Sequence, residues 1–62
     1  MEAERYVGRK VRIILKNNFH YTGLVIDTSE NKILIKDKFS NDVLISLDDI
    51  SLMEVLQENG NN

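Results

Sequence analysis

Five short runs of β-branched and other aliphatic residues, separated by polar turn residues, dominate this chain from residue 10 onward. In the third run Ile33 and Ile35 alternate with charged residues, a pattern typical of a strand with one buried face. Asn17 and Asn18 follow the first run and tolerate positive φ, so they predict a hairpin turn. The pattern predicts strands at residues 10–16, 20–27, 32–38, 42–47 and 51–56.

The segment before these runs favours a short helix. Residues 2–5 are good helix formers with acids near the start, and Gly8 stands where a helix C-terminal cap would lie. A helix of under two turns is unstable alone, so we expect Tyr6 and Val7 to dock on the strands.

The strands are too few and too short for a two-sheet sandwich. Gly23 lies inside the second run, and a strand glycine usually marks a strong bend or a close backbone approach. Residues 47–50 predict one helical turn between the last two strands. The predicted fold is therefore all-β: a small, strongly bent five-stranded antiparallel barrel with a short N-terminal helix, spanning residues 1–56. Residues 57–62 are polar and predict a disordered tail.

The size of the chain predicts self-association. Apolar burial in a domain of 62 residues contributes on the order of 90 kcal/mol, and ordering the chain costs about as much. Small domains close such a gap with disulfides, a metal or a partner chain, and this sequence has no cysteine and one histidine. An open strand edge carrying Leu52, Val55 and Leu56 would also aggregate unless another copy covered it.

Charge is distributed unevenly along the sequence. Residues 1–20 carry a net charge of +3, and residues 21–62 carry −5. The basic segment could meet phosphates; the alternative is a solvated surface of mixed sign. The basic side chains that we single out as candidate RNA contacts are Arg5, Arg9, Lys10 and Arg12. No apolar run is long enough to span a membrane and no signal-peptide pattern opens the chain, so we expect a cytoplasmic protein without membrane contact.

The sequence offers little for catalysis or metal binding. His20 is the single imidazole, with no cysteine in the chain. Residues 27–31 resemble the start of a calcium loop, but Lys32 and Lys38 stand where that loop needs glycine and a bidentate glutamate. We therefore expect neither an enzyme nor a metal or cofactor site.

The stretch 11–23 resembles the first motif of the Sm and Sm-like (LSm/Hfq) family of RNA-binding proteins. An alternating strand ends in Leu15-Lys16, a two-residue turn follows, and Gly23 falls at the expected spacing. The segment 43–55 resembles the last two strands of the family around a short turn. The second motif diverges, because Asp48 and Asp49 occupy the turn where the family carries an Arg-Gly pair.

The resemblance implies a ring of six or seven copies, in which the fourth strand of one copy pairs with the fifth strand of the next. It implies an interface and an RNA site, and single-stranded U- or A-rich RNA as the candidate partner. The implied interface residues are Val43, Ile45, Leu52 and Val55, and the implied RNA residues are Asp27 and Asn31. Two hypotheses remain open: an RNA-binding ring that serves as an RNA chaperone or RNA-processing scaffold, and an Sm/SH3-like oligomerisation and protein-interaction module that has lost the nucleotide pocket.

Overall fold

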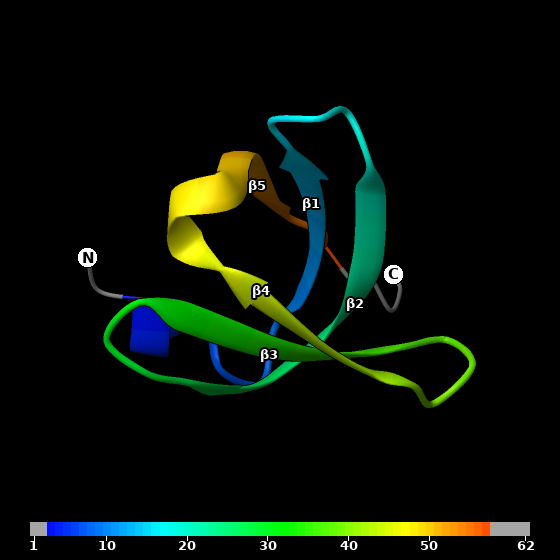
Figure 1. The fold of residues 1–62 in the computed structure, drawn as a ribbon. Coiled ribbons are helices and arrows are strands. Elements are labelled where there is room, and N and C mark those ends of the chain that lie inside the picture. Colours follow the sequence, from blue (N-terminus) through cyan, green and yellow to red (C-terminus); the bar gives the residue numbers. More distant parts are fainter. Residues whose placement is uncertain (1–2, 58–62) are drawn as a thin grey trace.

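The computed structural model describes residues 3–57 and confirms five antiparallel strands (Figure 1). Residues 58–62 of the predicted tail lie outside the described residues. In chain order the elements are the 3-10 helix η1 (Ala3–Tyr6), β1 (Lys10–Leu15), β2 (His20–Thr28), β3 (Lys32–Asp37), β4 (Asp42–Ser46), the 3-10 helix η2 (Leu47–Asp49) and β5 (Ile50–Val55).

The strands form one sheet in the order β4-β3-β2-β1-β5. The long strand β2 holds the sheet together, because its first part pairs with β1 and its second part with β3. β2 curves along its length, so the sheet folds back on itself (Figure 1). A shift in register between Val25 and Asp27 adds to this curvature. Within residues 3–57 no ladder joins β4 to β5, so the sheet is strongly bent but open, with these two strands as its edges.

The core lies on the concave face of the sheet and follows the alternation seen in the sequence. Val11 and Ile13 on β1, and Ile33 and Ile35 on β3, are completely buried, as their period-two spacing predicts. The buried cluster consists of Val11, Ile13, Val25, Ile33, Ile35 and Ile45.

Gly23 allows β2 and β3 to approach closely. A Cβ atom at this position would lie 2.5 Å from the carbonyl oxygen of Lys36 and 3.2 Å from the Cα of Asp37. Asp37 is the register partner of Gly23 across the ladder. The expectation of a bend or a close backbone approach at Gly23 is therefore confirmed as a close approach.

The N-terminal segment differs from the prediction in part. The expected helix is a single 3-10 helix of four residues, and Tyr6 packs against the core as expected. Val7 does not dock: it is 44% exposed and precedes Gly8, whose φ is +88°. The Gly8 N–H donates to the Val25 carbonyl (2.8 Å), which ties the chain to β2 just before β1 begins. No helix among residues 3–57 has the length and apolar character needed to cross a bilayer.

Candidate nucleic-acid interface

One end of the sheet carries the loop between β2 and β3 together with η2. The Leu47 N–H donates to the Asn31 carbonyl (2.9 Å), which fastens η2 to this loop. The Lys16 N–H donates to the Asp49 carbonyl (2.9 Å), which fastens η2 to the end of β1. Asp48 lies between these two anchors and is exposed, as Asp49 is. With Glu30 of the β2–β3 loop, which is also exposed, this end of the molecule presents three carboxylates, and we call it the acidic end.

The structure does not bring the side chains of Asp27 and Asn31 into one hollow. The Asp27 carboxylate accepts the N–H of its neighbour Thr28 (2.9 Å) and lines a shallow hollow of about 120 Å³ near Leu44. Asn31 is exposed and is absent from the lining of that hollow. Asn31 is anchored through its backbone, in its bond to Leu47.

The four predicted basic residues are spread over η1, the following loop and β1. The Arg5 guanidinium lies 5.9 Å from the centre of the Tyr6 ring. Arg12 is paired with Glu54 of β5 at 2.6 Å, and both side chains are about half exposed. A surface pair of this kind adds little to stability, but it partly neutralises Arg12.

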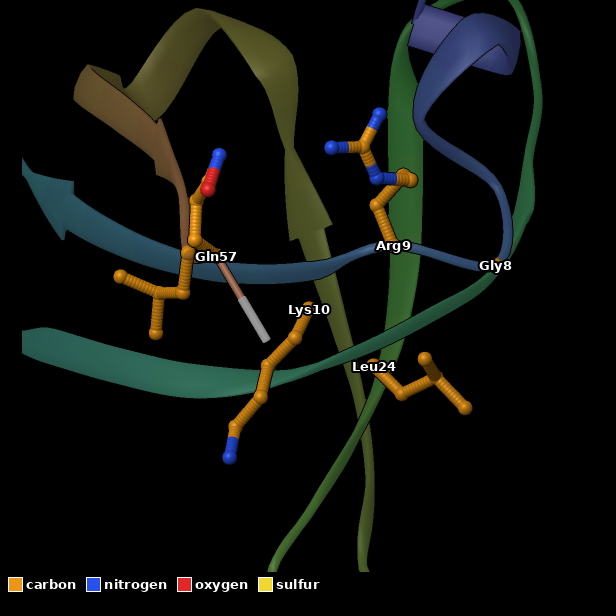
Figure 2. A pocket seen from close by; sticks show the side chains of 6 residues that line it. Gly8, Arg9, Lys10, Leu24 and Gln57 are labelled. Atoms are coloured by element: carbon orange, nitrogen blue, oxygen red, sulfur yellow. The ribbon is translucent and has the colours of Figure 1, made fainter. Parts of the chain in front are cut away.

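Arg9 and Lys10 line a hollow of about 390 Å³, which we call the N-terminal hollow. Figure 2 shows their side chains pointing in different directions, with the Arg9 guanidinium on the same side as the Gln57 amide and the Lys10 amine on the other. Leu24 forms part of the apolar wall. Two cations therefore flank this hollow rather than converge on a single point.

Lys10 also belongs to a second hollow, which the sequence did not reveal. The register pairs Lys10 with Leu24 and Leu24 with Lys36, so the two lysines lie on either side of one β2 residue. Lys38 follows on the same side and completes a hollow of about 260 Å³, which we call the lysine hollow. Its lining residues are Lys10, Thr22, Gly23, Leu24, Lys36, Asp37 and Lys38. We call this exposed, convex side of β1, β2 and β3 the outer face.

Two acids moderate the charge of the outer face. Asp42 pairs with Lys36 (2.9 Å between Oδ1 and Nζ). Asp37 accepts backbone N–H bonds in the β3–β4 turn, and the bond from Asn41, with a further one from Phe39, lowers the pKa of this carboxyl below its ordinary value of 3.8. Asp37 is thus engaged in holding the turn. Among residues 3–57, Arg9, Lys10 and Lys38 have no acidic side chain within ion-pair distance.

The predicted interface residues lie on the two edge strands but differ in exposure. Ile45 points into the core and is 5% exposed, whereas Val43 and Val55 are half-buried against it. Leu52 is 47% exposed, and Leu44 of β4, which was not singled out from the sequence, is 63% exposed. Any contribution of Ile45 to an interface would come from its backbone.

The hydrogen-bond pattern shows which backbone groups face outward at each edge. The Leu56 N–H donates to the Lys10 carbonyl (2.8 Å), so the alternation of an antiparallel ladder turns the amides of Val55 and Met53 away from β1. The hydrogen bond from the Asp37 N–H to the Asn41 carbonyl (3.0 Å) closes the β3–β4 hairpin. Because amides alternate in direction along β4, the Leu44 amide then points away from β3. Both edges therefore offer unpaired backbone donors and acceptors.

Comparison with solved structures supports the fold. The whole chain superposes, with a TM-score of 0.81 and 19% sequence identity, on 70% of a chain in a structure described as "Structural basis of the Dcp1:Dcp2 mRNA decapping complex activation by Edc3 and Scd6". No protein-family model matches the sequence. No curated protein matches it either. The likeness shows a shared small antiparallel β fold.

Proposed function

We propose that this chain is an Sm-like subunit that binds single-stranded RNA along its outer face and assembles into a ring through its β4 and β5 edges. The observation that carries the RNA proposal is the continuity of the N-terminal hollow with the lysine hollow, which share Lys10 and Leu24. Lys10, Lys36 and Lys38 lie together on the outer face, and Arg9 lies beside them at the N-terminal hollow, pointing away from Lys10 (Figure 2). Closely spaced cations of this kind neutralise successive phosphates of a nucleic-acid backbone.

The acidic end does not suit RNA. Asp48 and Asp49 place carboxylates at the turn where the family resemblance implies a cation, and a ring would repeat them in every copy. Such a field repels phosphate, so we assign RNA binding to the outer face instead. The solved neighbour supports an RNA-related setting, since its description concerns an mRNA decapping complex and the proteins that activate it.

The open edges support assembly. β4 and β5 end the sheet on opposite sides, and each turns backbone amides outward. An edge of one copy that pairs with the other edge of the next gives a heterologous contact, which closes into a ring when the rotation is right. Pairing would also cover Leu44 and Leu52, which are exposed in the single chain.

Fluorescence anisotropy with labelled ten-residue oligo(U) and oligo(A) RNA tests the RNA proposal. If each of the four cations neutralises one phosphate, log K should fall with log salt with a slope of about −3. The double variant Arg9→Ala/Lys10→Ala should reduce that slope by about 1.4, because two phosphate contacts are lost. The matched control, Lys16→Ala/Lys32→Ala, removes the same charge outside the two hollows and should leave the slope unchanged.

A second candidate function follows from the acidic end. If no RNA binds at low salt while the chain still assembles, the carboxylates at Asp48 and Asp49 would instead mark an oligomerisation and protein-interaction module.

The anisotropy experiment has its own contradicting outcome. Equal losses of RNA affinity in the Arg9→Ala/Lys10→Ala and Lys16→Ala/Lys32→Ala variants would show that RNA binding is not localised on the outer face.

A further inference from the structure

We propose that the β3–β4 turn forms a nucleotide-stacking subsite, in which a base of single-stranded RNA lies on the Phe39 ring while its phosphate meets Lys38. This inference rests on the proposed RNA binding and adds a specific site to it. The outer face contains a third hollow, of about 440 Å³, which we call the aromatic hollow. It is lined by His20, Tyr21, Thr22, Asp37, Lys38 and Phe39.

Phe39 presents a flat apolar ring to solvent. It is 73% exposed, more than any other large hydrophobic side chain among the described residues. Single exposed apolar residues are common and need no explanation by themselves. Phe39 differs because its ring forms part of a hollow that also contains cationic and hydrogen-bonding groups.

The turn fixes the backbone of Phe39. The Asp37 carboxylate accepts the N–H groups of Phe39 and Asn41, both at 2.9 Å. The Ser40 N–H donates to the Asp37 carbonyl (3.0 Å), and Ser40 adopts a φ of +67°, as in three-residue hairpin loops that end in a left-handed residue. A turn with this many internal bonds loses little backbone freedom when a ligand binds to the ring that it carries.

The polar groups of the aromatic hollow suit a nucleotide. The Lys38 ammonium lies over one face of the Phe39 ring, 5.4 Å from its centre, so a base stacked on the other face would have a cation close by for its phosphate. His20 and Thr22 add an imidazole and a hydroxyl, both able to hydrogen-bond a base or a sugar. The volume lies within the range of about 300–1,000 Å³ that is typical of ligand pockets.

The aromatic hollow also continues the basic face. It shares Thr22, Asp37 and Lys38 with the lysine hollow, which in turn shares Lys10 with the N-terminal hollow. A single strand of RNA that crosses the outer face would therefore pass from Arg9, along the lysines of the lysine hollow, to Phe39. Because every base has a stacking face, this arrangement favours single-stranded RNA with little sequence preference.

The experiment compares the binding of labelled oligo(U) decamer to F39A with binding to its matched control, F19A. Phe19 is also exposed, at 60%, but lies on the β1–β2 turn and lines none of the three hollows. F39A should weaken binding about 5- to 150-fold and leave the salt slope unchanged, because stacking releases no counterions. F19A should bind as the wild type does, and circular dichroism should show that both variants are folded.

The variant F39W supplies a direct readout, because the chain contains no other tryptophan. Stacking of a base should quench its fluorescence, and F39W should retain wild-type affinity. A wild type that binds RNA while F39A loses nothing relative to F19A would overturn the subsite but leave the proposed function standing. A wild type that binds no RNA would refute both.

A decaglutamate peptide serves as the comparison for acidic protein partners. We expect it to bind weakly and with no dependence on Phe39. If the peptide bound as tightly as the RNA and lost the same affinity in F39A, the site would belong to an acidic peptide and the nucleotide assignment would be overturned.

Discussion

Gly23→Ala should destabilise the chain by forcing β2 and β3 apart. The new methyl group would lie 2.5 Å from the Lys36 carbonyl oxygen, whereas ordinary contacts begin at 3.4 Å, so one strand must move by 0.9 Å. The colliding atoms belong to the backbone of the ladder partner and cannot rotate away. Overpacking of this kind costs about 1–3 kcal/mol, and a displaced ladder hydrogen bond adds about 1 kcal/mol. Alanine returns about 0.5–1 kcal/mol through a less flexible unfolded chain, which leaves a net loss of about 1–3 kcal/mol.

Urea unfolding followed by circular dichroism measures this loss. The free energy of unfolding of a chain of this size falls by about 1 kcal/mol per molar urea, so the urea concentration at the unfolding midpoint should fall by about 1–3 M. The matched control is Thr22→Ala, an exposed neighbour on the same strand, which should change stability by less than about 0.5 kcal/mol. All variants must be compared at one protein concentration, because assembly itself stabilises the folded state. A Gly23→Ala midpoint equal to that of Thr22→Ala would refute the close-approach argument.

Two further predictions concern the β5 edge and the β3–β4 turn. Val55→Pro removes an amide that faces away from β1, so it should leave a folded chain by circular dichroism but reduce the assembly to smaller species in light scattering; an unchanged assembly would exclude β5 as the pairing edge. The native turn lowers the pKa of Asp37, so its contribution to stability is present above about pH 4, the value in the unfolded chain, and is lost as pH falls through the lower folded value. Urea midpoints measured between pH 2 and pH 6 should therefore fall less on acidification in Asp37→Asn than in the wild type, and parallel pH profiles would contradict this reasoning.

Much of the fold could be predicted because local signals agree with the final structure. The alternation in the third run identified Ile33 and Ile35, both of which are fully buried on β3. The turn at residues 17–18 also behaves as expected, since Asn18 has a φ of +73°. These features depend on one strand or one turn, so sequence spacing alone is enough to predict them.

The candidate site was harder to predict because it depends on register between strands. Lys10 and Lys36 are distant in sequence and share a hollow through their common neighbour Leu24. The pairing of Arg12 with Glu54, 42 positions away, is likewise a product of the β1–β5 ladder. The alternating charges of β3 could have pointed to an outer face, but no spacing rule shows which strands lie beside it.

Exposure of the edge residues was also beyond the sequence pattern. Ile45 and Leu44 are adjacent aliphatic residues on β4, yet one is buried and the other is 63% exposed. Which of the two faces the core depends on the register between β3 and β4. The β3–β4 turn sets this register by pairing Ile33 with Ile45.

Native mass spectrometry of the wild-type chain, with and without oligo(U) decamer, tests ring assembly and RNA binding in one experiment because it reports copy number and ligand together. We expect a closed species of six or seven copies that gains mass in steps of one RNA molecule. A folded monomer at micromolar concentration that carries no RNA would contradict both the edge pairing and the RNA binding.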